Sequence, residues 1–541
     1  MDYNFMTLSK LWADYVPDAF AFDATASEES EKDGIVYKKT FFTSEKALDG
    51  DVRVACGITH KKDCNGHVVV YAGDLFKGGD KEMISRLAEA GYIVADIDFL
   101  RSEYPESLFY GKPDVSSPYY LYAKPSAKYT SWYVWAKMLK RAAVYMQSVY
   151  GSDKVILMAE NKATTAAYMA AGSDKSFSAL VTVSGGGYMS YDGMYKYGGE
   201  TLVIDEEREC FIAGIEAQTY AKFIDIPVLV LLSTNGALTD IDRGMDLFDI
   251  FAGQKTLVIS PNLRDCITSA AAYNIPIWLG EALSGVPLKK NPSGEIVVSE
   301  YQYYFNVKTD DFDGIEAVTV YYSTTNTVPY YREWKKIKAE ETVAGEYIAK
   351  LEIGEEAEIL FAFADVHYTD GRNLSSKSVV KTPLDVIQKE TNIKNRIIYS
   401  RETGINFVPL GLDSLIAGEN LISQSPGAYG ITGLTSKDGG MINYSIGSAD
   451  TGGDAAALQA DAYTTSDKSF VISIFKYGTD GTDGKYSCSV DLKAGDEWQR
   501  ISLEPRMFKN DGLKYADSFE CVKILEIENA DGIIFNNILF V

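Results

Sequence analysis

Short, almost uninterrupted runs of Val, Ile, Leu and Ala recur between residues 35 and 260, and helical patterns separate several of them. Strands that are apolar on both faces are expected in a parallel sheet covered on both sides. Their alternation with helices predicts a doubly wound α/β domain. The predicted strands are 35–42, 52–59, 67–73, 92–98, 155–159, 177–184, 226–233 and 255–260, and the predicted helices are 81–91, 132–151 and 162–172.

Two all-β regions are expected after the α/β region, because a chain of 541 residues is too long for one core. Alternating apolar and polar residues in 297–308, 315–324, 346–353 and 357–371 predict a small sandwich of immunoglobulin or fibronectin type III class. At least eight strand patterns after residue 404, separated by Gly, Asp and Ser turns, are typical of a jelly-roll sandwich. The predicted domains are 1–288, 289–383 and 404–541, with a linker over 384–403.

One predicted strand and the helix after it are joined by a very short turn, in the stretch KVILMAENKATTAAYMAAG (154–172). This layout resembles the nucleophile elbow, G-x-S-x-G, of the α/β-hydrolase superfamily, in particular its bacterial esterase and acyl-peptidase-like members; the resemblance covers roughly half of the chain. Ala159 and Ala163 take the places of the small flanking residues, and Asn161 takes the place of the nucleophile. An amide is no acyl acceptor, because its nitrogen lone pair is delocalised into the carbonyl. The alternative is that Asn161 is only a turn residue that tolerates the left-handed conformation.

The resemblance also implies places for the acid and the histidine of a catalytic triad. The acid of the family follows the strand at 226–233, where Asp240 and Asn235 are both candidates. The histidine lies after the last strand, where this chain has Asp265. The chain contains three histidines, His60, His67 and His367, and none lies in the α/β region after the elbow. Because a Ser–His relay needs an imidazole, we interpret this domain as a pseudoenzyme, which if active would be a carboxylic ester hydrolase.

Three further positions are possible remnants of a site. Gly73 follows a strand in the usual oxyanion-hole region, although such a glycine is more often only a turn. Ser184, in VSGGGY, is a possible substitute nucleophile, but strand-end serines before glycine are usually structural and no histidine is placed to activate it. Glu160, together with Asp240 and Asp265, would make a carboxylate cluster for a metal or for acid–base work, whereas loop carboxylates are normally solvated. We predict no cofactor for this domain.

The last region resembles carbohydrate-binding modules of the jelly-roll type, in its strand number, its turns and its closing strand GIIFNNILFV (532–541). The resemblance implies a polysaccharide or glycan partner, stacked on aromatic rings. The candidate rings, each of which is alternatively a core residue, are Tyr429, Tyr463, Tyr477, Tyr486 and Trp498. A structural Ca²⁺ is common in the modules it resembles, and we assign no ligands to it. The carboxylates of the loop 478–484 lack the EF-hand pattern and favour a hairpin turn.

The net charge of −24 argues against nucleic acid as a partner. No apolar run approaches the ~20 residues of a membrane span, and the first twenty residues lack the features of a signal peptide. Six scattered cysteines indicate neither a zinc site nor a disulfide framework. We expect a bacterial protein that is extracellular or at the cell surface if a leader was removed, and otherwise cytoplasmic. The predicted function is non-catalytic polysaccharide binding.

Two other functions stay open at this point. One is an active carbohydrate or acyl esterase whose active site has been relocated. The other is a protein-interaction scaffold, indicated by the Tyr-rich segments 116–135 and 327–334. Those segments also suit contacts between domains, which we consider the better interpretation.

Overall fold

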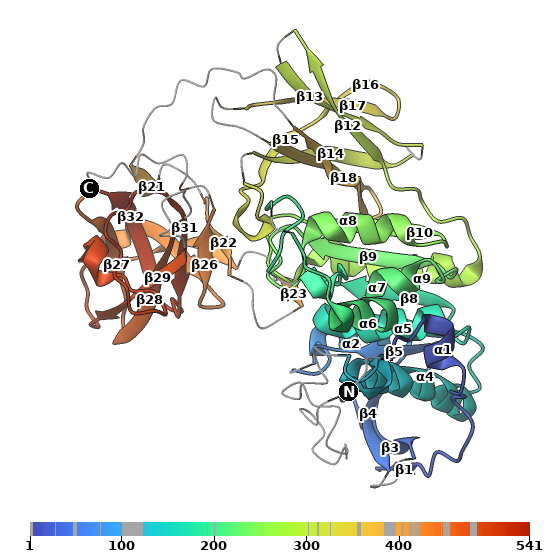
Figure 1. Ribbon diagram of the computed structural model, residues 1–541. Coiled ribbons are helices and arrows are strands. Elements are labelled where there is room, and N and C mark those ends of the chain that lie inside the picture. The colour runs from blue at the N-terminus through green and yellow to red at the C-terminus, as the bar shows by residue number, and fades with distance from the viewer. Residues whose placement is uncertain are drawn as a thin grey trace.

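The computed structural model of the protein describes residues 4–541, and Figure 1 shows its three parts. The described ranges have gaps at 28, 47–50, 76, 100–122, 192, 200, 301, 311–312, 325, 354–358, 383–395, 402–404, 411–414, 418–420, 445, 447–454 and 477–483. An α/β part comes first, a β part lies above it in the figure, and the C-terminal β part lies to the left.

The α/β part is built on a sheet in the order β1-β3-β4-β6-β5-β7-β8-β9-β10, with β2 paired to β3. Its strands are β1 (Thr25–Ala26), β2 (Ser30–Lys32), β3 (Ile35–Glu45), β4 (Val52–Lys61), β5 (Val68–Ala72), β6 (Ile93–Ile97), β7 (Val155–Glu160), β8 (Ala179–Val183), β9 (Val228–Ser233) and β10 (Lys255–Ser260). The strands from β6 to β10 are parallel, and β4 is antiparallel to both of its neighbours. All eight strands predicted from apolar runs are confirmed.

Helices cover both faces of this sheet, as expected for strands that are buried throughout. One face packs against α1 (Leu8–Trp12), α4 (Ser131–Tyr150), α5 (Thr164–Ser173), α6 (Glu206–Gly214), α7 (Ala217–Ala221) and α8 (Ile241–Ile250). The other face packs against α2 (Lys81–Glu89) and α9 (Ser269–Ser284). The three predicted helices are confirmed as α2, α4 and α5. At the end of α4, Gly151 has φ 64°, the left-handed C-cap conformation that glycine adopts without strain.

The middle part consists of two antiparallel sheets that share a core with α9. One contains β12 (Ser293–Ser299), β13 (Gln302–Lys308), β17 (Glu346–Leu351) and β16 (Glu340–Val343). The other contains β15 (Lys335–Lys338), β14 (Ile315–Thr324), β18 (Leu360–Tyr368), β19 (Asn373–Ser375) and β20 (Val379–Lys381). The prediction of one strand over 297–308 is wrong, because Glu300 takes φ 48° and folds the segment into a hairpin. The predicted strand 357–371 likewise ends at Tyr368 and turns back into β19.

The C-terminal part also has two antiparallel sheets around one core. One contains β21 (Ile397–Tyr399), β24 (Ile422–Pro426), β25 (Thr432–Ser436), β27 (Leu458–Tyr463), β30 (Gln499–Leu503) and β32 (Ile534–Phe540). The other contains β22 (Val408–Pro409), β26 (Met441–Asn443), β28 (Lys468–Lys476), β29 (Gly484–Leu492) and β31 (Val522–Glu528). Because β21 pairs with β32, this part begins before residue 404, inside the predicted linker.

One segment of the chain returns from the C-terminal part to the α/β part. There β23 (Ile416–Ala417) pairs in parallel with β11 (Ile267–Thr268), which follows β10. The N–H of Leu415 also donates to Oδ2 of Asp80, the N-cap residue of α2, at 3.0 Å. The α/β part therefore has contacts with both later parts.

Candidate functional site

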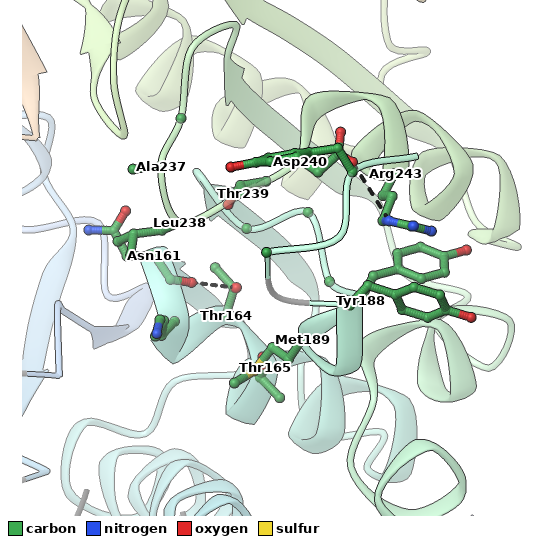
Figure 2. Close-up of a pocket in the computed structure, with 18 of the residues that line it drawn as sticks. Asn161, Thr164, Thr165, Tyr188, Met189, Ala237, Leu238, Thr239, Asp240 and Arg243 are labelled. Carbon is green, nitrogen blue, oxygen red and sulfur yellow. Dashed lines mark hydrogen bonds and ion pairs between the residues drawn. The ribbon is translucent and has the colours of Figure 1, made fainter. Parts of the chain in front are cut away.

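The turn after β7 has the geometry of an elbow, with Asn161 at its apex. Asn161 takes φ 51° and opens the 3₁₀ turn η2 (Asn161–Ala163), which continues directly into α5. The hydroxyl of Thr164 donates to the main-chain oxygen of Asn161 at 2.6 Å (Figure 2). A Cβ on Gly185 would lie 2.3 Å from Thr164, so the helix and the β8 loop approach each other as closely as glycine allows. Asn161 thus occupies the predicted position, in the predicted conformation.

A carboxylate accepts a hydrogen bond from this apex. The amide Nδ2 of Asn161 donates to Oδ2 of Asp74 at 3.2 Å, and Oδ1 of Asp74 accepts from the N–H of Lys77 at 3.2 Å. Asp74 follows β5, in the loop where the fold's resemblance places the oxyanion hole. A negative charge there opposes the charge that a carbonyl oxygen acquires during acyl transfer. The sequence analysis missed Asp74, whose only signal is its position directly after Gly73.

Gly73 itself has a packing role. A Cβ at this position would lie 2.3 Å from the main-chain nitrogen of Gly79, so the loop after β5 folds back tightly on itself. This close approach fits the interpretation of Gly73 as a turn residue.

Asp265 stands at the place expected for the histidine and holds a neighbouring loop. Its Oδ2 accepts from the N–H of Ala237 at 2.9 Å, and its Oδ1 accepts from the N–H of Leu238 at 3.1 Å. Burial raises the pKa of Asp265 above its ordinary value, and the charge of Asp74 acts in the same direction. A carboxylate used in this way fixes the conformation of the loop and offers no imidazole for proton transfer.

The two candidates for the triad acid both bond to protein groups. Nδ2 of Asn235 donates to the main-chain oxygens of three residues in the middle part: Pro329 at 3.3 Å, Tyr330 at 3.3 Å and Arg332 at 2.7 Å. Asp240 is the N-cap of α8, where its Oδ1 accepts from the N–H of Asp242 at 2.8 Å and its Oδ2 from the N–H of Lys196 at 2.9 Å. Asn235 docks a domain and Asp240 caps a helix.

Ser184 and Glu160 do not join these residues in one centre. Ser184 is buried at the end of β8 with φ 51°, and its hydroxyl has no hydrogen-bond partner within the described ranges. Glu160 is also buried; the hydroxyl of Tyr71 donates to it at 2.8 Å, and burial raises its pKa to about 8. Across the residues that the structure describes, no three His, Cys, Asp or Glu side chains form a group suited to a metal ion.

A cavity of about 120 Å³ lies beside the elbow. Figure 2 shows Asn161 and Leu238 toward one side of it, and Tyr188 and Arg243 toward the other. Its walls come from η2, the first turn of α5, the loop after β8, the loop after β9 and the first turn of α8. The lining includes Asn161, Lys162, Thr164, Thr165, Gly185, Gly186, Gly187, Tyr188, Met189, Tyr191, Met194, Ala237, Leu238, Thr239, Asp240 and Arg243.

Three of the predicted glycan-stacking residues do come together in the C-terminal part. The rings of Tyr463 and Trp498 lie 5.9 Å apart, and Nε1 of Trp498 donates to the main-chain oxygen of Ala428 at 3.1 Å. Tyr429 follows in the turn η5 (Ala428–Gly430), where it is 77 % exposed and donates its hydroxyl to Glu497 at 3.2 Å.

The other two predicted rings give a different result. Tyr486 is a correction: it is 4 % exposed and packs in the core, so its ring is not accessible to a ligand. Tyr477 and residues 478–483 lie outside the described residues, so the predicted ring and loop there stay predictions.

Comparisons with known proteins give a likeness only in structure. No protein-family model matches the sequence, and no curated protein matches it. A cold-adapted esterase from an Arctic intertidal metagenomic library is similar, with 13% identity, 49% of this chain and 99% of that chain covered, and a TM-score of 0.35. So is an acetyl xylan esterase from a Paenibacillus species, with 12% identity, 52% and 96% covered, and a TM-score of 0.38.

A second acetyl xylan esterase, from a Thermoanaerobacterium species, is also similar. It has 11% identity with this chain, covers 53% of this chain and 97% of its own, and has a TM-score of 0.37. Separately, none of the helices in the described ranges combines the length and the apolar character needed to cross a membrane.

Proposed function

We propose that this protein binds polysaccharide without cleaving ester bonds: an esterase-like domain that has lost its chemistry carries two β-sandwich domains. The proposed loss of esterase chemistry is supported by the arrangement of three residues, Asn161, Asp74 and Asp265. An amide stands at the apex of the elbow, a carboxylate bonds to it from the oxyanion side, and a second carboxylate takes the histidine place. No step of acyl transfer is favoured by this arrangement.

Glycan binding is assigned to the C-terminal part, which we take to be a jelly-roll module, while the middle part is taken as an immunoglobulin- or fibronectin-type spacer. Support comes from Tyr429, a large aromatic ring held outward next to Trp498 and Tyr463. An exposed tyrosine face suits the C–H face of a neutral sugar. We further propose a location outside the cell or at its surface, and a structural Ca²⁺ in the C-terminal sandwich.

The loss of chemistry is tested with p-nitrophenyl acetate and with a fluorophosphonate label on the full chain. We expect no turnover above buffer, no covalent label, and identical behaviour of Asn161→Ala. Turnover that Asn161→Ala abolishes, or a label on Ser184, would instead establish a working esterase with a relocated active site.

Glycan binding is tested by placing the full chain on a glycan array. We expect binding to a neutral polysaccharide, weakened about ten-fold or more by Tyr429→Ala because the stacking face is removed. Tyr515→Ala is the matched control, since Tyr515 is another exposed tyrosine of the same part. Absence of binding across the array, or equal effects of the two substitutions, would contradict the proposal and favour an interaction scaffold.

A further inference from the structure

Tyr429 lies in a turn that exposes its ring and strains its backbone. In η5 it takes φ 58° and ψ 20°, the left-handed conformation, which few residues other than glycine, asparagine and aspartate adopt. Its side chain is 77 % exposed, although a large aromatic ring gains free energy when it leaves water. Strain of this kind persists only where the surrounding structure fixes it, and it is typical of ligand sites.

The indole of Trp498 fixes the main chain of this turn. Its Nε1 donates to the main-chain oxygen of Ala428, directly before Tyr429, at 3.1 Å. Its six-membered ring lies against Gly427, where a Cβ would be 2.6 Å from Cζ2 and 3.0 Å from Cη2. Gly427 has φ −98°, so the backbone there would accept a side chain and the indole alone excludes one. The turn and the indole are therefore packed as closely as glycine allows.

Glu497, the residue before Trp498, fixes the tip of the tyrosine ring. The hydroxyl of Tyr429 donates to Oε1 of Glu497 at 3.2 Å. Three main-chain hydrogen bonds of 2.8 to 3.1 Å within 427–431 close the turn. Because both its main chain and its hydroxyl are bonded, the ring is ordered before a ligand binds, which lowers the entropy cost of binding.

Trp498 and Tyr463 are less suited than Tyr429 to stack on a ligand. Both side chains are half-buried, and Gly427 covers part of the indole. The two rings are tilted by 49° to each other, so they do not form the flat platform on which neighbouring sugar units could stack. The cluster therefore offers one well-exposed ring.

We propose that Tyr429 alone stacks on a sugar unit, and that Trp498 is a positioning residue, which holds the turn and does not contact the sugar. This inference rests on the proposed function of the C-terminal part. It assigns different roles to two rings that glycan stacking alone would treat alike. It also implies that the site takes a single sugar unit of a neutral chain.

The test is affinity electrophoresis of the full chain in gels that contain one of three soluble neutral polysaccharides: arabinoxylan, galactomannan or hydroxyethylcellulose. We expect at least one of them to retard the wild type, and Tyr429→Ala and Trp498→Ala each to weaken that binding about ten-fold. If Trp498 acts only through Tyr429, the double variant binds no more weakly than Tyr429→Ala. Two rings that stack independently would give a loss of about 100-fold in the double variant, which would overturn the proposal.

Gly427→Ala keeps every aromatic ring and tests the positioning directly. The added methyl group would meet the indole, so the turn must move. We expect about ten-fold weaker binding, together with faster amide hydrogen exchange in 427–431 and an unchanged far-ultraviolet circular-dichroism spectrum. Gly495→Ala is the matched control, because a Cβ there would lie 4.0 Å from the main-chain nitrogen of Glu497, an ordinary contact distance. It should change neither binding nor exchange.

Hydrogen exchange in 427–431 reports on the turn without any ligand, so this inference and the proposed function fail in different ways. If none of the three polysaccharides retards the wild type, the glycan function and the stacking role of Tyr429 are both contradicted. If exchange is unchanged in Gly427→Ala and in Trp498→Ala, the positioning role is overturned. The positioning role is equally overturned if the wild type binds and Gly427→Ala binds as tightly.

Discussion

At the scale of single residues, the turn after β7 holds an amide, Asn161, in a strained backbone conformation. Asn161 takes a positive φ, which for most side chains costs about 1–2 kcal/mol and which asparagine tolerates better. The turn is retained because α5 must start against β8, where Thr164 meets Gly185. Packing alone thus accounts for a conformation that in a hydrolase also has a catalytic purpose.

Glu160, next to Asn161, gives a prediction about pH. Burial raises its pKa from 4.5 to about 8, so the folded protein holds a proton between these values that the unfolded chain releases. The free energy of unfolding therefore falls as pH rises from about 5 to about 8. Glu160→Gln removes this titration, and its oxygen can still accept from Tyr71. We expect the free energy of unfolding of Glu160→Gln, relative to that of the wild type, to rise by on the order of 3 kcal/mol over this pH interval, measured by urea unfolding.

The control for this prediction is Glu82→Gln, on the exposed side of α2, which should follow the wild-type pH profile. If the difference between Glu160→Gln and the wild type is the same at about pH 5 and about pH 8, Glu160 does not titrate between its ordinary value and 8.

The sequence identified Asn161 because a local pattern surrounds it: a strand, small flanking residues and a helix. Asp74 has no such pattern, and its contact with Asn161 spans 87 positions of the chain. The prediction that Tyr486 stacks on a glycan is wrong, because Tyr486 shares the apolar face of β29 with Cys488, Val490 and Leu492. Polar side chains occupy the other face, so the period of two in this strand already favours burial of Tyr486.

At the scale of elements, the loops after β9 and β10 contact the middle and the C-terminal β parts, respectively. The loop after β9 holds the turn η4 (Pro329–Tyr331) through Asn235, and the buried guanidinium of Arg332 pairs with Asp242 of α8 at 3.0 and 2.5 Å. The Tyr-rich segment 327–334 therefore makes contacts between parts, in agreement with that interpretation of the segment. These contacts occupy the loop in which a triad acid is expected.

The substitution Asn235→Asp tests the contribution of the loop after β9 to stability. The substitution introduces a carboxylate and places its charge against three main-chain oxygens. A donor is replaced by a buried, unpaired acceptor, so we expect a loss of about 3 kcal/mol or more in the free energy of unfolding, measured with urea.

Asn65→Asp is the matched control. Its Oδ1 accepts from the N–H of His67 at 2.9 Å, and a carboxylate accepts equally well, so stability should change by less than about 0.5 kcal/mol. A similar small change for Asn235→Asp would mean that the loop relaxes and that the three contacts contribute little.

Elements were predictable where one property repeats over several residues. The strands of the α/β sheet are buried throughout and could be identified from composition alone. Helix α6 begins with EERE and has its apolar residues in one run after it, and α9 contains Pro276, so neither has the ordinary amphipathic signal. The hairpin of β12 and β13 was missed because its turn uses Glu300 in place of Gly or Asn.

At the scale of the whole molecule, one buried ion pair joins the first and the last part. Nη2 of Arg264, next to Asp265, donates to Glu526 of β31 at 2.7 Å, and its Nε donates to the hydroxyl of Tyr444 at 3.2 Å. Burial alone would raise the pKa of Glu526, but Arg264 and Lys485 outweigh it and hold this pKa below its ordinary value. The loop after β10 is thus part of an interface between domains.

Arg264→Met should separate the C-terminal part from the rest. The substitution removes one partner of a buried pair, which typically costs about 3–5 kcal/mol. We expect a larger radius of gyration in small-angle X-ray scattering, with an unchanged far-ultraviolet circular-dichroism spectrum. Arg500→Met, which breaks an exposed pair with Asp461 in the same part as Glu526, should leave the radius unchanged. An unchanged radius for Arg264→Met as well would contradict a role of this pair in docking.

No local signal in the sequence predicts this junction. Arg264 and Glu526 are 262 positions apart, Arg264 in the loop after β10 and Glu526 within β31. The order of the three parts followed from periodicity. Their docking depends on contacts between residues far apart in the sequence, both polar pairs and the core shared with α9, which only the folded chain brings together.

The pairing of β11 with β23 has a consequence for how the chain is made. Ile267 leaves the ribosome long before its partner Ile416. The hydroxyl of Ser269 likewise bonds to the main-chain oxygen of Ala417, which is synthesised 148 residues later. Until then the Ile267 N–H lacks the Leu415 oxygen that it later finds, and the Asp80 carboxylate lacks the Leu415 N–H. The first domain to be synthesised therefore completes its hydrogen bonds only after most of the chain has been made. A nascent chain stalled before residue 415 exposes these unpaired groups to chaperones.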